Sequence, residues 1–202
     1  MPINHIAFTI GNATAGAAAE IRQVAAIAEA LLAELRRISD DIDRIHRWRA
    51  KSDDIQATFF GWLEQSYKVS IEKTEGFEDT TTRHNRPDAQ IWLDSLGTRR
   101  VLVEVERGGT VTNGHDLKDM WKAHLSPLVQ HLFLVVPNTI EAEDGTLRSD
   151  QAFLRCSARL GSFFQNSRTE VDVLSVHLFG YGANPVPRRT SPRTGAAGIA
   201  QA

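Results

Sequence analysis

The chain has 202 residues, of which 42% are hydrophobic and 24% are charged, and its formal net charge is −2 at pH 7. These values are typical of a soluble globular domain with a proper core, and they exclude a protein that attracts nucleic acid through its net charge. Cys156 is the single cysteine, which excludes an intramolecular disulfide and fits a reducing cytoplasm. We expect no membrane span, and residues 1–19 lack the positive start of a secretory signal.

Residues 21–45 place hydrophobic side chains in alternating steps of three and four. The repeat consists of Ile21, Val24, Ala28, Leu31, Leu35, Ile38, Ile42 and Ile45. This heptad spacing predicts one long amphipathic helix within an N-terminal region, residues 1–50. The helix either packs on its own domain or forms a coiled coil with a second copy, and both interpretations stay open.

Residues 51–183 show a mixed helix and strand pattern, read from helix caps, apolar alternation and turn residues. The expected elements are a helix from Ser52 to about Leu63, strands at 67–71, 89–93 and 101–106, a helix from Asn113 to Leu125, a strand at 131–136, a helix at 149–165 and a strand at 171–179. Residues 184–202, which contain several prolines and arginines, are expected to form a disordered tail.

Two acidic residues share one side of the strand expected at 101–106. Glu104 and Glu106 point the same way because side chains on a strand alternate between its faces. Two adjacent carboxylates repel each other, and a divalent cation between them turns this repulsion into coordination. Asp88, sixteen positions before Glu104, begins a neighbouring strand and can supply a third carboxylate. The three residues predict a Mg²⁺ or Mn²⁺ site; the alternative is that Asp88 caps a turn and both glutamates face solvent.

Pro87-Asp88 followed by Glu104-x-Glu106 resembles the motif of the PD-(D/E)xK nuclease superfamily, which includes many restriction and repair endonucleases. The resemblance covers about residues 53–180. It implies a restriction endonuclease-like α/β/α core of three layers with a mixed sheet, preceded here by the long N-terminal helix. Glu106 stands where the superfamily usually has lysine, a variant that some type II restriction endonucleases share.

The resemblance also implies roles for the residues of the motif. Asp88 and Glu104 would bind the metal, with the backbone carbonyl of Val105 as a further ligand. Glu106 would orient or deprotonate the attacking water, or hold a second ion.

The helix expected after this strand could supply the positive charge that the missing lysine leaves absent. His115, Lys118 and Lys122 share one face of it, and either lysine, with Lys122 as the assigned candidate, could act as the substitute. The alternative is a solvated helix face. Glu64 resembles the additional acid that many members present from their first core helix, and Glu72 and Glu75 compete for this role.

The resemblance favours a magnesium-dependent deoxyribonuclease, an endonuclease of restriction or defence type, that hydrolyses phosphodiester bonds in DNA; the same chemistry would also suit RNA. A homodimer joined through the N-terminal coiled coil would suit the two strands of a duplex.

The arginines available for phosphate contacts are Arg83, Arg86, Arg99, Arg100 and Arg107. A basic stretch from Arg44 to Lys51 could also touch phosphates, or could be the solvated end of the long helix.

The alternative function is a catalytically inactive nuclease-fold module that binds nucleic acid or a protein partner through its coiled coil.

Overall fold

One mixed β-sheet forms the centre of the computed structural model, which describes residues 3–73, 86–107, 113–147, 151–165 and 171–183. The strand order in this part of the chain is β1-β6-β5-β4-β3-β2. The strands are β1 (Asn4–Thr9), β2 (Val69–Ile71), β3 (Ala89–Trp92), β4 (Arg100–Val105), β5 (Val129–Pro137) and β6 (Ser175–Tyr181). Strands β4, β5 and β6 run parallel, and the other neighbouring pairs are antiparallel. The expected α/β class and the mixed sheet are confirmed.

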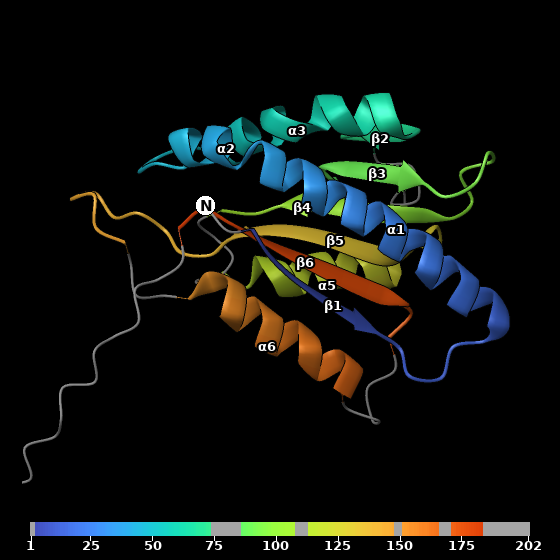
Figure 1. Ribbon diagram of the computed structural model, residues 1–202. Helices are drawn as coiled ribbons and strands as arrows, with labels where there is room; N and C mark the ends of the chain where they lie inside the picture. The colour runs from blue at the N-terminus through green and yellow to red at the C-terminus, as the bar shows by residue number, and fades with distance from the viewer. Residues whose placement is uncertain (1–2, 74–85, 108–112, 148–150, 166–170, 184–202) are drawn as a thin grey trace, which may run out of the picture.

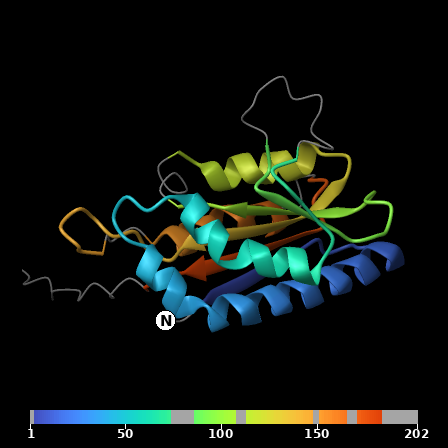
Figure 2. The same ribbon diagram turned by 90° about the horizontal axis from the view of Figure 1, so that it is seen from above.

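Helices cover both faces of this sheet, so the described residues form three layers (Figures 1 and 2). One face packs against α1 (Ala15–Arg37), α2 (Ser39–Ile45) and α3 (Ser52–Ser66). The other face packs against α5 (His115–Leu125) and α6 (Ala152–Gln165). Both of these helices are crossovers between parallel strands, β4-α5-β5 and β5-α6-β6, and crossovers of one hand place their helices on the same face.

The alternation of side chains along β4 decides which layer each residue meets. Val101, Val103 and Val105 belong to the hydrophobic cluster under α1, α2 and α3, whereas Leu102 belongs to the cluster under α5 and α6. Glu104 follows Leu102 by two positions and therefore faces the α5 side. Because the three valines of β4 pack into the core under α1, α2 and α3, Glu104 projects from the opposite face of the sheet.

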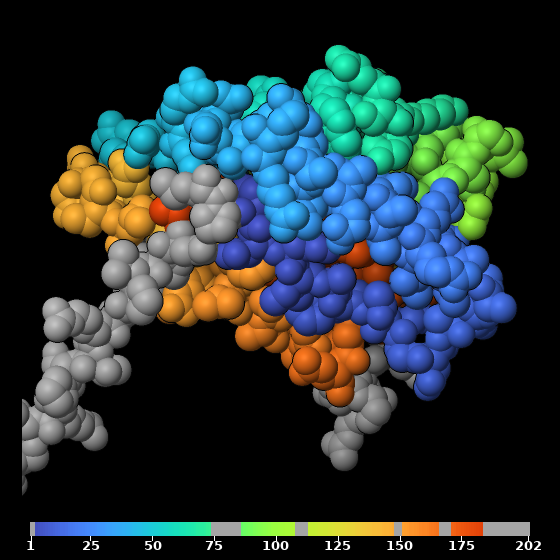
Figure 3. Space-filling model, viewed as in Figure 1, coloured from blue at the N-terminus to red at the C-terminus, as the bar shows by residue number. Residues whose placement is uncertain are grey.

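The heptad-patterned segment is two helices, not the single helix that we expected. Ile38 separates α1 from α2 with φ −99° and ψ 12°, so the helical backbone is interrupted at this residue. Most of the heptad side chains are nevertheless buried against the sheet: Val24, Ala28, Leu31, Leu35, Ile38 and Ile42. The seam therefore packs on its own domain, and Figure 3 shows residues of α1 on the outer surface of the molecule. A homodimer stays a prediction, and it would need a surface other than this seam.

The first strand, β1, was not predicted from the sequence. It pairs antiparallel with β6 at the edge of the sheet, so a strand precedes the long helical segment. Ile6 and Phe8 pack towards α6, while His5 stacks on Phe179 on the other face at 4.8 Å between ring centroids. The six residues of β1 show too little alternation of polar and apolar side chains to predict a strand. Their pairing with β6 stabilises the extended conformation.

Several element boundaries also differ from those expected. Gly114, not Asn113, is the N-cap of α5; its φ of 64° lies in the left-handed region, which glycine adopts without strain. The last strand begins at Ser175 rather than at 171. The start expected for α6 at 149 and the tail expected at 184–202 lie outside the described residues. None of the helices described is both long enough and apolar enough to cross a bilayer.

Truncating a side chain of the heptad seam tests whether this seam is part of the core. Leu31→Ala removes a fully buried side chain and is expected to lower the free energy of unfolding by about 2–5 kcal/mol. Leu154→Ala makes the same chemical change at a side chain that is 52% exposed, and should cost less than about 1 kcal/mol. Urea unfolding followed by circular dichroism measures both. Equal costs for the two variants would contradict the packing of α1 on the sheet.

Candidate functional site

Asp88 and Glu104 are neighbours on adjacent strands. Strands β3 and β4 pair with Ala89 opposite Val103, and continuing this register by one residue places Asp88 opposite Glu104. Residues directly opposite each other in antiparallel strands project to the same face of the sheet. Asp88 Oδ2 accepts a hydrogen bond from the backbone N–H of Val105 at 2.8 Å, which fixes this carboxylate at the end of β4.

Helix α5 presents three ionisable side chains to this end of the sheet. His115, Asp119 and Lys122 are spaced i, i+4 and i+7 and therefore share one helix face. Lys122 Nζ donates to Glu104 Oε1 at 2.7 Å and lies 3.1 Å from Asp119 Oδ1. His115 Nδ1 lies 2.8 Å from Glu106 Oε2. Each glutamate of the Glu104-x-Glu106 pair therefore has its own partner on α5.

Burial makes these acids harder to ionise. Glu104 and Asp119 are only 3% and 1% exposed, and burial is the main reason that their pKa values are raised. Burial also raises the pKa of Asp88 to about 6, although the Val105 N–H and Lys122 act in the opposite direction. The pKa of Glu106 rises to about 7 through burial and the charge of Asp119, against the effect of His115. The cluster therefore gains protons close to neutral pH.

Lys122 stays charged despite its burial. Removal from water favours the neutral amine, but the charges of Glu104 and Asp119 outweigh this effect and raise the pKa of Lys122 above its ordinary value. One ammonium group thus serves two buried carboxylates. The negative charge of the cluster still exceeds the positive charge that α5 brings to it.

The donor chemistry of the cluster fits a divalent cation. Its carboxylate oxygens are the hard ligands that Mg²⁺ and Mn²⁺ prefer, and Asp119 Oδ2 is buried without a hydrogen-bond partner among the described residues. The present arrangement is not a finished metal cage, because no group of three His, Cys, Asp or Glu side chains in the described part of the chain is placed to hold an ion. The Lys122 ammonium takes one oxygen of Glu104 instead.

The structure brings together four of the residues predicted from the sequence: Asp88, Glu104, Glu106 and Lys122. Val105 takes part through its N–H, and the role of its carbonyl as a metal ligand stays a prediction. Of the two lysines considered, Lys122 is buried in the cluster and Lys118 is exposed. The alternative of a solvated helix face therefore does not hold for Lys122.

Glu64 is not brought to the cluster. It is exposed in the last turn of α3, whereas Asp53 in the first turn of that helix is close enough to Asp88 for its charge to raise the pKa of Asp88. Eleven residues of helix separate the two acids by about 16 Å. The competitor Glu72 pairs with Arg86 instead, and Glu75 lies outside the described residues.

Asp119 is the residue of the cluster that the sequence prediction missed. Its signal was present, because Asp119 lies four residues after His115 and three before Lys122, on the face where we expected only positive groups. Acidic side chains on a helix are mostly exposed, and the burial of Asp119 depends on the packing of α5 on the sheet.

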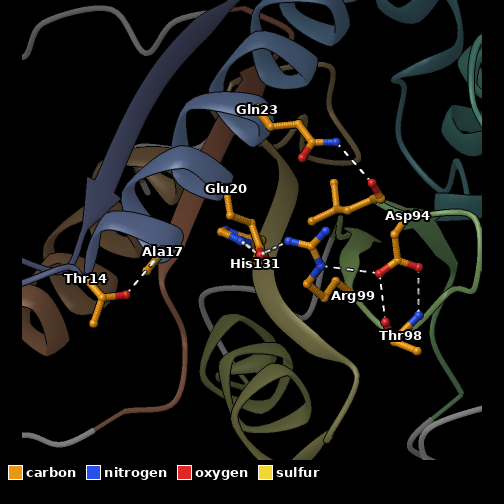
Figure 4. Close-up of polar contacts among 9 residues, drawn as sticks. Thr14, Ala17, Glu20, Gln23, Asp94, Thr98, Arg99 and His131 are labelled. Carbon is orange, nitrogen blue, oxygen red and sulfur yellow. Dashed lines mark hydrogen bonds and ion pairs between the residues drawn. The ribbon is translucent and has the colours of Figure 1, made fainter.

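Arg99, just before β4, and Arg100, the first residue of β4, lie at the opposite, amino end of this strand and are engaged within the chain. Figure 4 shows the contacts of Arg99. Arg99 Nη1 donates to Glu20 Oε2 at 2.7 Å, and Glu20 Oε1 lies 3.1 Å from Nε2 of the buried His131. Arg100 is buried and donates to the carbonyl of Gly97 at 2.8 Å. These two arginines form contacts within the fold, with Glu20 and with the carbonyl of Gly97, and do not reach the acidic cluster. The predicted contact residue Arg83 lies outside the described residues.

Comparisons with known proteins do not assign the chain to a family. No protein-family model matches it, and no curated protein is detectably similar to it in sequence.

Replacing Asp88 by asparagine tests the raised pKa. The carboxyl group of Asp88 titrates near pH 3.8 when exposed and near 6 in the fold, so its ionisation destabilises the folded state as the pH rises through this window. Asparagine can still accept the Val105 N–H. Asp88→Asn should therefore raise the free energy of unfolding by about 1–3 kcal/mol near pH 8 in chelator, and by little near pH 4.

The control for this measurement is Asp144→Asn. Asp144 is exposed, and its hydrogen bonds to Thr146 lower its pKa, so its neutralisation should not stabilise the protein at either pH. Urea unfolding at both pH values gives the comparison. A gain for Asp88→Asn that does not change with pH would contradict the raised pKa.

Removing the Lys122 ammonium should destabilise the fold, because it leaves two buried carboxylates without their shared counter-charge. Lys122→Met is expected to cost about 2–5 kcal/mol near pH 8, and less as the pH falls and the acids take up protons. Lys118→Met, the same change at an exposed position on α5, is the matched control. Thermal unfolding that is equally affected by both changes would show that Lys122 does not balance the cluster.

Proposed function

We propose that this protein is a Mg²⁺- or Mn²⁺-dependent endonuclease with a restriction endonuclease-like core, and that it hydrolyses phosphodiester bonds in DNA. The observation that carries the proposal is the meeting of Asp88, Glu104 and Lys122 from two adjacent strands and a crossover helix at one end of a mixed sheet. These are the residue types that the PD-(D/E)xK motif requires, with the lysine supplied from α5. The three-layer architecture is compatible with that core.

Asp88 and Glu104 would hold the metal ion, with the carbonyl of Val105 beside them. When bound, the metal would supply Lewis-acid stabilisation of the negative charge that builds up on the phosphate. Glu106 is suited to accept the proton of the attacking water, because a pKa of about 7 matches a general base that works near neutral pH. His115, 2.8 Å from Glu106, orients this carboxylate.

Lys122 would provide the positive charge that the strand itself lacks at position 106. A buried ammonium aimed at the end of β4 stabilises negative charge on a reacting phosphate more strongly than an exposed one, since water screens it less. Asp119 holds this ammonium from the α5 side at 3.1 Å. The strand position that usually carries lysine can therefore be occupied by Glu106 without loss of a nearby cation.

A second candidate function is a nuclease-fold module without catalytic activity. It is favoured by the ion pair between Lys122 and Glu104, which occupies a predicted metal ligand. Binding to a partner through the heptad seam is not supported, because that seam is buried within the chain. Such a module would have to use another surface.

Cleavage assays separate these two functions. The wild-type protein should cut plasmid or linear DNA only with Mg²⁺ or Mn²⁺ present, and single-stranded DNA and RNA substrates define its preference. Asp88→Asn, Glu104→Gln and Glu106→Gln should each reduce the cleavage rate by about 10²-fold or more, since each removes a ligand or the base. Glu64→Gln, at an exposed site outside the cluster, should leave the rate unchanged.

Isothermal titration calorimetry with the metal alone gives a readout that does not depend on turnover. Asp88→Asn and Glu104→Gln should weaken Mn²⁺ binding, while Glu64→Gln should not. Absence of both cleavage and metal binding in the wild-type protein would refute the proposed function.

A further inference from the structure

The segment between α2 and α3 concentrates positive charge on a chain that is slightly acidic overall. Arg44, Arg47, Arg49 and Lys51 fall within eight residues, and no acidic residue interrupts them. All four side chains are exposed, and Trp48 among them is 36% exposed. We call residues 44–51 the basic loop. Because α2 ends at Ile45, most of this loop is not the solvated end of a helix but a separate connection.

The basic loop is attached to the residues that follow the three parallel strands. His46 Nε2 donates to the carbonyl of Thr139, just after β5, at 3.0 Å. Arg107, the residue after Glu106, donates through Nη2 to the carbonyl of Arg47. Both contacts lie at the carboxyl end of the sheet, where β4 also presents Glu104. Figure 2 shows the α2–α3 connection at this end of the molecule.

Close packing under the loop keeps this attachment in place. Gly182, after β6, has a φ of 77°, and a Cβ added there would lie 2.9 Å from the His46 ring, so only glycine allows the ring to approach this closely. The His46 ring also packs edge-on against Tyr181 at 4.9 Å, and the Tyr181 hydroxyl donates to the backbone carbonyl of Glu106 at 3.0 Å. The loop is thus connected through one aromatic side chain to the backbone of the candidate site.

Two of the four cations of the basic loop are ion-paired within the chain, Arg44 with Asp41 and Arg47 with Glu141. Among the described residues, no acidic side chain forms an ion pair with the side chain of Arg49 or Lys51, although the Asp54 carboxylate accepts from the backbone N–H of Lys51 at 2.9 Å. Arg47 reaches Glu141 at 3.4 Å, but the Arg47 side chain is 65% exposed, and water and salt screen an ion pair whose cation is this exposed. Guanidinium groups match phosphate oxygens in two parallel hydrogen bonds, and an exposed indole offers a face for a base.

We propose that the basic loop is a binding site for the phosphodiester backbone of a nucleic acid, placed to hold the strand beside the acidic cluster. That it positions a substrate rests on the proposed nuclease function; that it binds the backbone does not. Arg47, Arg49 and Lys51 contact phosphates, and Arg107 extends the same charged edge towards Glu106. The acidic cluster repels a polyanion, so a cationic surface at its rim is what brings a phosphate close to it.

The test replaces two of these cations in the full-length chain. Arg49 has a φ of 67°, which asparagine tolerates better than alanine, so the variant is Arg49→Asn with Lys51→Gln. The matched control is Arg22→Gln with Lys68→Gln, which removes the same charge. Arg22 lies on α1 between Glu20 and Gln23, which bond to residues at the amino end of β4, and Lys68 lies over Trp92 at that end. Circular dichroism verifies that both variants fold.

Fluorescence anisotropy in chelator measures binding without cleavage, with labelled duplex DNA, single-stranded DNA and RNA of one sequence as probes. For the preferred probe, the loop variant should bind at least about tenfold more weakly than wild type at low salt. For duplex DNA, the slope of log K against log salt should fall by about 1.8, the value for two lost phosphate contacts. The control variant should keep both values near those of wild type.

An unchanged affinity and salt slope in the loop variant would overturn the inference, and so would a wild-type protein that binds none of the three probes. A protein that cleaves DNA while its loop variant binds normally refutes the loop and leaves the nuclease. Loop-dependent binding without cleavage under any metal supports the loop and refutes the nuclease. Equal weakening by the control variant would show that only net charge matters and would also overturn the inference.

Discussion

The ammonium group of Lys122, enclosed between Glu104 and Asp119, is the interaction on which the candidate site depends. Two buried carboxylates side by side cannot both ionise in a medium of low dielectric constant unless a cation lies between them. Lys122 supplies that cation from a crossover helix, and this fixes α5 over the end of β4. The position of the helix in turn places His115 against Glu106. One charge requirement therefore orders the strand, the helix and the second glutamate together.

Both ends of the sheet carry buried polar side chains, but acids and cations are balanced differently at each end. At the amino end of β4, Glu20 is bonded to Arg99 and His131, and His131 is bonded to the buried Ser175 at 2.7 Å. Each of these groups has a partner, and a satisfied network of this kind stabilises the packing of α1 on the sheet. At the carboxyl end the acids outnumber the cations, and their pKa values are raised. Unbalanced buried charge is typical of a site that binds something, whereas balanced charge is typical of structure.

The sequence predicted what depends on local patterns and missed what depends on tertiary contacts. Strand alternation was sufficient to place Glu104 and Glu106 on one face, and the β3–β4 hairpin brought Asp88 to Glu104. Glu64 does not lie beside this cluster, because core packing sets the direction of α3 relative to the sheet and brings its first turn, not its last, to Asp88. Asp119 and β1 were missed for a related reason: an acid next to a buried lysine and a short edge strand acquire their roles only from partners distant in sequence.

The proposed metal ion and the Lys122 ammonium would be alternative counter-charges for the Glu104 carboxylate. Asp119 matters to this competition because it gives Lys122 a second carboxylate 3.1 Å away, with one oxygen still unpaired among the described residues. A lysine without that second partner would have to stay on Glu104 or leave a buried charge uncompensated, which is costly. With Asp119 present, Glu104 would be able to bind the proposed metal ion while Lys122 remained charged beside Asp119. Asp119, which lies outside the Asp88, Glu104 and Glu106 pattern, would thus make a lysine on α5 compatible with the proposed metal site.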